Sequence, residues 1–129
     1  MAKVSRNALV PYTAAQMYEI VNAIEQYPQF VPWCVASTEK EITMIEKKAT
    51  LKFARRALKT SFTTKNILSE NERIEMQLVE GPFKRLEGVW LFADIDSAGS
   101  KVELDLEFEI SNRIIRACLL YTSPSPRDS

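Results

Sequence analysis

The clearest pattern in this 129-residue chain is the stretch Lys101-Val102-Glu103-Leu104-Asp105-Leu106-Glu107-Phe108-Glu109-Ile110. From Val102 onward, apolar residues alternate with acidic ones. Successive side chains of a β-strand point to opposite faces of a sheet. The stretch is therefore predicted to be an antiparallel strand with one buried apolar face and one solvated acidic face.

The same period of two extends back towards residue 35 and predicts a meander of hairpins. Short turn signals such as Glu70-Asn71 and Gly81-Pro82 separate the alternating segments. The six strands are predicted at 35–42, 44–55, 58–68, 73–79, 86–94 and 101–110.

Before this meander, the sequence predicts one strand, one helix and a short helical loop. Residues 3–10 alternate loosely and end at Pro11, which cannot donate to a ladder. Thr13 is a candidate N-cap, with Gln16 at the capping-box position, for an amphipathic helix over residues 14–24. Two prolines in residues 25–34 favour one short helical turn and a loop.

The order of elements predicts an α+β fold with one curved antiparallel sheet. One sheet face is apolar and needs a cover. Residues 113–117 contain good helix formers without alternation, so we expect them to begin a C-terminal helix that supplies this cover.

The last twelve residues break every earlier pattern. Residues 118–128 back-translate into a string that resembles a transposase adapter used in sequencing libraries, and such segments are excluded from fold reasoning. We therefore expect a domain over residues 1–117 whose covering helix is truncated, followed by a non-native tail at 118–129.

Composition argues against several classes of protein. The charges of seventeen basic and seventeen acidic residues cancel, so the net charge does not indicate DNA binding. No apolar run approaches the roughly 18–20 residues of a membrane span, residues 1–20 lack the order of a signal peptide, and two distant cysteines make no disulfide framework. The expected location is the cytoplasm, with peripheral contact to the inner membrane left open.

The sequence also predicts that the protein is not an enzyme. It contains no histidine, which is the commonest general base and metal ligand. Cys34 has no basic neighbour in sequence and is expected to be a packed thiol. No phosphate-binding or metal-binding motif occurs, so we expect no metal and no required cofactor. A cyclase-like enzyme is disfavoured because no acid–base pair is evident.

A basic stretch crosses one predicted hairpin and allows two interpretations. It is either a solvated hairpin or a docking patch for anionic lipid or RNA phosphate. Its members are Lys47, Lys48, Lys52, Arg55, Arg56 and Lys59.

Two motifs carry a resemblance to a known family. They are Tyr27-Pro28-Gln29-Phe30-Val31-Pro32-Trp33-Cys34 and Pro82-Phe83-Lys84-Arg85-Leu86-Glu87-Gly88-Val89-Trp90-Leu91-Phe92. With shorter segments over residues 3–117, the chain resembles the coenzyme Q-binding, START-like family of the polyketide cyclase/START superfamily. The resemblance implies a helix-grip fold, in which the sheet wraps around a C-terminal helix and leaves an apolar tunnel. It also implies a non-catalytic role: some members carry or chaperone ubiquinone for respiration, and bacterial ribosome association toxins block the joining of ribosomal subunits.

The leading hypothesis is a carrier or chaperone for ubiquinone or another polyprenyl quinone. The alternative is a toxin-like regulator that binds the large ribosomal subunit through the basic stretch. A single outward basic patch would favour the ribosome-binding hypothesis. Scattered lysines together with a deep tunnel would favour the carrier hypothesis.

Alternation and loop placement, not the family, suggest the residues of the quinone site. Phe53, Phe62, Met76, Trp90 and Phe92 are expected to line the tunnel, Phe30, Trp33 and Phe83 to form its mouth, and Lys84 and Arg85 to meet a head group or phospholipid.

Overall fold

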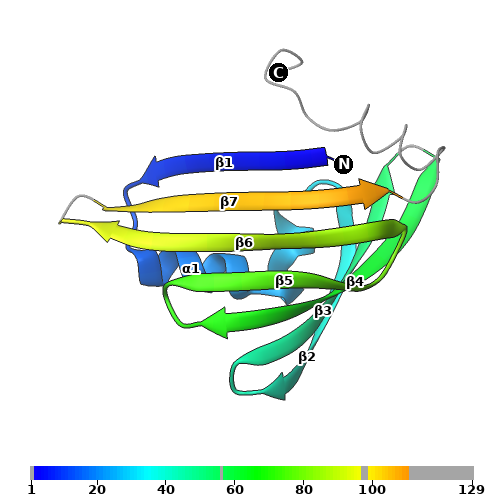
Figure 1. Cartoon of the computed structure of the whole chain (residues 1–129), viewed down its shortest axis with the longest axis horizontal. Helices are drawn as coiled ribbons and strands as arrows, with labels where there is room; N and C mark the ends of the chain where they lie inside the picture. Colours follow the sequence, from blue (N-terminus) through cyan, green and yellow to red (C-terminus); the bar gives the residue numbers. More distant parts are fainter. Residues whose placement is uncertain (1, 56, 97–98, 111–129) are drawn as a thin grey trace, which may run out of the picture.

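The computed structural model of the chain describes residues 2–55, 57–96 and 99–110 (Figure 1). It confirms the α+β class and every predicted strand. The predicted C-terminal helix and the tail lie outside the described residues. The elements are β1 (Ala2–Val10), α1 (Ala14–Asn22), the 3-10 helix η1 (Ile24–Gln29), β2 (Cys34–Thr43), β3 (Glu46–Arg55), β4 (Leu58–Ser69), β5 (Arg73–Glu80), β6 (Phe83–Ile95) and β7 (Gly99–Ile110).

The seven strands form one antiparallel sheet in the order β1-β7-β6-β5-β4-β3-β2. Strands β2 to β7 follow each other as hairpins, as the short turn signals predict. Strand β1 closes the other edge by pairing with β7, from Ala2 opposite Phe108 to Val10 opposite Ser100. Figure 1 shows the sheet curving from β7 towards β2, with α1 on one side of it. We call the face towards α1 the inner face and the opposite one the outer face.

The capping box predicted for α1 is present and fixes where the helix begins. The hydroxyl of Thr13 accepts a hydrogen bond from the Gln16 backbone N–H at 3.1 Å, and the Gln16 side-chain oxygen accepts from the Thr13 N–H at 2.9 Å. The Ala14 N–H donates to the carboxylate of Asp94 at 2.8 Å, which ties the start of the helix to β6.

A small core lies under α1, at one end of the inner face. Its buried members are Ala14, Tyr18, Ile74, Phe92 and Val102. The rings of Tyr18 and Phe92 meet edge to face with centroids 5.7 Å apart. Because α1 is only nine residues long, this packing covers only part of the apolar face of the sheet.

The segment after α1 is attached to the far strands by main-chain and side-chain hydrogen bonds. The hydroxyl of Ser37 on β2 donates to the carbonyl of Ile24 at 2.7 Å, and the Ala54 N–H on β3 donates to the carbonyl of Trp33 at 3.0 Å. These bonds hold η1 and the loop after it above the inner face, opposite β4 to β7.

Candidate functional site

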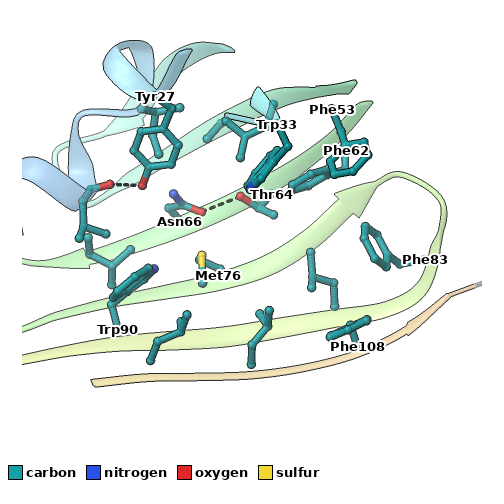
Figure 2. A pocket seen from close by; sticks show the side chains of 18 of the residues that line it. Tyr27, Trp33, Phe53, Phe62, Thr64, Asn66, Met76, Phe83, Trp90 and Phe108 are labelled. Carbon is teal, nitrogen blue, oxygen red and sulfur yellow. Dashed lines mark hydrogen bonds between the residues drawn. The ribbon is translucent and has the colours of Figure 1, made fainter. Parts of the chain in front are cut away.

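The inner face holds a cavity of about 360 Å³. This volume lies within the usual range of small-molecule sites, and most of the lining is aliphatic or aromatic, as in ligand pockets generally. Figure 2 shows four phenylalanines at one end of the cavity, Tyr27 and Trp90 at the other, and Thr64 and Asn66 between them. The lining residues are Val21, Ile24, Tyr27, Trp33, Ala49, Leu51, Phe53, Arg55, Phe62, Thr64, Asn66, Ile74, Met76, Phe83, Leu86, Trp90, Leu104, Leu106 and Phe108.

Six of the eight apolar residues expected at the quinone site line this cavity. Two edge-to-face contacts, Phe62–Phe83 at 5.7 Å and Phe83–Phe108 at 6.1 Å between centroids, form one end of it. Trp33 packs against Phe53 at 5.5 Å and brings the proline-rich loop to the same end. The six are Trp33, Phe53, Phe62, Met76, Phe83 and Trp90.

The other two expected residues lie elsewhere. Phe30 is 55% exposed and rests its ring on Tyr27, so it is not part of the lining. Phe92 belongs to the core under α1, where it is 5% exposed. Phe92 does face inwards, as its alternation with Trp90 predicts, but α1 covers that end of the strand. Strand alternation alone does not tell which inward residues a helix covers.

Lys84 and Arg85 lie outside the cavity. The Lys84 ammonium is 3.7 Å from the carboxylate of Glu109, and the Arg85 guanidinium donates to Glu87 at 2.6 Å. The hydrogen bond to Glu87 raises the pKa of Arg85. Lys84 is paired with a glutamate of β7 and Arg85 with one of its own strand β6, and neither cation is part of the cavity lining.

The basic stretch is divided between the two faces because β3 alternates. Arg55 lines the cavity, and Lys47 is 5% exposed on the inner face. The Lys47 ammonium bonds Glu39 at 2.7 Å and the carbonyl of Asn22 at 2.6 Å, which attaches the β2–β3 hairpin to the end of α1. Lys47 and Arg55 therefore do not share one outward surface with the other lysines of the stretch, and Arg56 lies outside the described residues.

The other lysines of the stretch join two more on the outer face. Lys48 lies directly opposite Lys40 on β2 and Lys65 on β4, so three ammonium groups form a row across three strands. Within residues 2–55, 57–96 and 99–110, none of the lysines on this part of the face makes an ion pair, whereas Lys3, Lys84 and Lys101 each pair with a glutamate of β7. We call Lys40, Lys48, Lys52, Lys59 and Lys65 the outer lysine surface.

Three polar residues of the cavity were missed by the sequence reasoning. Thr64 and Asn66 are buried on β4, and the Thr64 hydroxyl donates to the Asn66 side-chain oxygen at 2.8 Å. The Tyr27 hydroxyl donates to the carbonyl of Val21, and burial, with a smaller contribution from Cys34 and Glu39, raises the pKa of Tyr27 to about 12. The cavity thus presents neutral polar groups in an apolar wall.

This lining is suited to binding. Tyr27 and Arg55 are its ionisable members among the described residues, and the raised pKa of Tyr27 keeps that phenol neutral at neutral pH. Cys34 is 2% exposed, its thiol donates to the carbonyl of Ala36, and burial raises the pKa of that thiol, which disfavours the nucleophilic thiolate. In the part of the chain that the structure describes, no group of three metal-binding side chains occurs, and no helix is long and apolar enough to cross a membrane.

A curved antiparallel sheet with an apolar cavity on its inner face defines a START-like, helix-grip domain. The chain belongs to the family described as polyketide cyclase / dehydrase and lipid transport, which matches residues 10–121. Among solved structures, a START superfamily protein from Mycobacterium smegmatis superposes with a TM-score of 0.73 at 20% identity, covering 98% of this chain and 83% of that one.

Several relatives carry functional names, and two of them represent the two kinds of protein that are relevant here. Ribosome association toxin RatA of Escherichia coli (strain K12) is 42% identical over 115 residues, which is 89% of this chain and 73% of that protein. Coenzyme Q-binding protein COQ10, mitochondrial, of Dictyostelium discoideum is 30% identical over 84 residues, or 63% of this chain and 41% of that protein.

Proposed function

We propose that this protein binds an apolar ligand of the polyprenyl quinone class, such as ubiquinone, and acts as its non-catalytic carrier or chaperone without a required cofactor. The observation that carries this proposal is the cavity of about 360 Å³, whose wall is mainly aromatic and aliphatic. The name of the coenzyme Q-binding relative supports the quinone class.

The energetics of burial favour a ligand with a long hydrocarbon part. Each methylene group removed from water contributes about 0.8 kcal/mol, and association costs ~4–15 kcal/mol in lost freedom. Two or three isoprene units therefore offset most of that cost, and the quinone ring adds further contacts with the cavity wall. A small polar metabolite would gain little from this wall.

The direct test is to purify the chain from quinone-rich cells and identify co-purifying lipids by mass spectrometry. We expect a polyprenyl quinone at close to one molecule per protein. Leu51→Glu is the matched negative variant because Leu51 lines the cavity, and Lys52→Glu is the control because the adjacent residue points outwards. Protein free of lipid in every preparation, with no uptake of added quinone, would refute the proposal.

A second candidate function is association with the ribosome, supported by the outer lysine surface and by the name of the RatA relative. Like charges directly opposite each other on a sheet are destabilising, so the row Lys40–Lys48–Lys65 has a cost to the fold. An RNA phosphate backbone would neutralise the row and release counterions on binding. The residues between the lysines are small and polar, such as Thr50 and Ser61, which favours RNA over insertion into a membrane.

Ribosome association is tested by sedimentation of the protein with large ribosomal subunits at several salt concentrations. A plot of the logarithm of the affinity against the logarithm of the salt concentration gives a slope that counts phosphate contacts. The triple change Lys40→Glu, Lys48→Glu and Lys65→Glu should make this slope shallower by about three, one for each lost contact. The control, Lys3→Glu with Lys84→Glu and Lys101→Glu, alters net charge equally at lysines that are already paired. Equal losses in both triple variants would argue against a dedicated surface.

A further inference from the structure

Thr64 and Asn66 form a buried polar pair in the wall of the cavity. They are 6% and 3% exposed, and both side chains come from the inward positions of β4. An amide moved from water into apolar surroundings costs several kcal/mol unless its hydrogen bonds are replaced. A side chain of this kind therefore needs partners for both its oxygen and its nitrogen.

Among the residues that the structure describes, only the oxygen of the Asn66 amide has a hydrogen-bond partner. It accepts the hydrogen bond of the Thr64 hydroxyl, whereas the nitrogen Nδ2 has no acceptor among the described residues. Nor is Nδ2 sealed off inside the protein, unlike the buried oxygen of Asn22. Figure 2 shows the pair on the cavity wall near Tyr27 and Met76. Two N–H donors are thus available to a molecule in the cavity.

We propose that Asn66 anchors the polar end of the ligand by donating from Nδ2 to an uncharged acceptor oxygen, such as a quinone carbonyl. This inference rests on the proposed ligand-binding function and adds the orientation of the ligand. The acceptor oxygen lies at the end of the cavity near Tyr27 and Trp90. The hydrocarbon part extends towards Phe53, Phe62 and Phe83.

The positions of the charged groups explain why the acceptor is neutral. The cationic side chain among the described lining residues is Arg55, at the end of β3. Asn66 on β4 lies opposite Lys47 on β3. Lys47 and Arg55 are eight residues apart along β3, which corresponds to about 26 Å. The Lys47 ammonium is itself occupied by Glu39 and the Asn22 carbonyl. A carboxylate at Asn66 would have no free cation, whereas a carbonyl needs none.

Thr64 acts as a positioning residue for the Asn66 amide. A hydroxyl that donates to the amide oxygen fixes which edge of the amide faces the ligand. Without the hydroxyl, the amide can rotate and present its oxygen, which repels a carbonyl. Thr64 therefore affects the preference for acceptor oxygens without contributing a bond of its own to the ligand.

The test compares two probes with the same decyl tail: decylubiquinone, which carries acceptor oxygens, and decylbenzene, which has none. Their affinities are measured by displacement of an uncharged fluorescent dye from the full chain. Asn66→Leu should weaken decylubiquinone binding about tenfold, the usual size of one lost hydrogen bond. Decylbenzene should bind as well as before or better. Lys65→Leu, which places the same side chain on the outer face, should change neither affinity.

Two further variants keep the test valid if Asn66→Leu fails to fold. Circular dichroism checks the folding of every variant. Asn66→Asp keeps the size of the side chain but removes both donors, and should also lose decylubiquinone selectively. Thr64→Val should lower decylubiquinone affinity several-fold and leave decylbenzene unchanged. Equal decylubiquinone affinity in wild type and folded Asn66 variants would overturn the inference while leaving the ligand-binding function intact. Failure of both probes to bind the wild type would overturn both.

Discussion

Tyr27 joins the end of α1 to η1 through a partly buried hydrogen bond from its hydroxyl to the carbonyl of Val21. Its pKa is raised from the usual value near 10 to about 12, mainly by burial, so the folded protein favours the neutral phenol. This contribution to stability is complete below pH 10. It is lost as the pH rises from about 10 to about 12, because the unfolded chain releases the proton first.

We therefore predict that Tyr27→Phe flattens the decline in the free energy of unfolding between pH 9 and pH 12. The part of the decline due to this residue should be about 2–3 kcal/mol in the wild type. Urea denaturation at a series of pH values measures it. Tyr12→Phe, at an exposed tyrosine, is the control. An unchanged pH profile in Tyr27→Phe would mean that the phenol is more accessible to water than its position suggests.

Gly99 allows β7 to begin against the end of β1. Its φ of +133° is rarely adopted by other residues, and a Cβ there would lie 2.0 Å from the carbonyl oxygen of Val10. Gly99→Ala should therefore destabilise the protein by roughly 3 kcal/mol. Its neighbour Ser100 has a buried hydroxyl without a hydrogen-bond partner among the described residues, so Ser100→Ala should be neutral or slightly stabilising. Thermal denaturation of the two variants gives the comparison.

At the scale of elements, β3 assigns different roles to adjacent lysines. Lys47 faces inwards and attaches the β2–β3 hairpin to the C-terminal end of α1, where a cation also favours the helix dipole. Lys48 faces outwards in the lysine row. We predict that Lys47→Met costs about 2 kcal/mol of stability, because it leaves Glu39 and the Asn22 carbonyl without their donor. Lys48→Met should change stability by less than about 0.5 kcal/mol.

Urea denaturation of these two variants tests the register of the hairpin. A slip of one residue would exchange the faces of all side chains on β3. Equal effects of Lys47→Met and Lys48→Met, or a larger effect of the second, would contradict the register in which Lys47 lies opposite Asn66.

The strands were predictable because their apolar and polar residues alternate with a period of two. The predicted 101–110 is the observed Gly99–Ile110, and the predicted 86–94 is the observed Phe83–Ile95. The difference at β6 has a local cause. Phe83 pairs with Ile110 through a bulge, so the strand begins directly after Pro82, where alternation is interrupted. The pairing of β1 with β7 is non-local and has no signature in the sequence.

The polar part of the candidate site was less predictable. Residues 63–66 read Thr-Thr-Lys-Asn, and four polar residues in succession do not reveal which of them face inwards. In the structure, Phe62 lines the cavity. Because β4 keeps its register against β3 from Phe62 onward, Thr64 and Asn66 face the cavity as well. The division of the basic stretch between the two faces was hidden in a similar way, because a count of charges along the chain ignores the alternation that separates Lys47 from Lys48.

For the molecule as a whole, one sheet separates two surfaces of different chemistry. The apolar cavity occupies the inner face and the outer lysine surface the other. Strand β4 contributes to both, since Asn66 faces inwards and the preceding Lys65 faces outwards. A ligand in the cavity and an RNA on the outer face would not compete for space. The two proposed functions are therefore compatible within one chain.

We predict that the two surfaces can be disabled separately. Decylubiquinone at about 100 times its dissociation constant should stabilise the wild type by ~2.7 kcal/mol. The triple change Lys40→Glu, Lys48→Glu and Lys65→Glu should retain that stabilisation, seen as an equal rise in melting temperature, while losing association with ribosomal subunits. Leu51→Glu should show the reverse. Loss of the ligand effect in the triple variant would instead reveal coupling through the sheet, and β4, which connects Lys65 to Asn66, would be the element that transmits it.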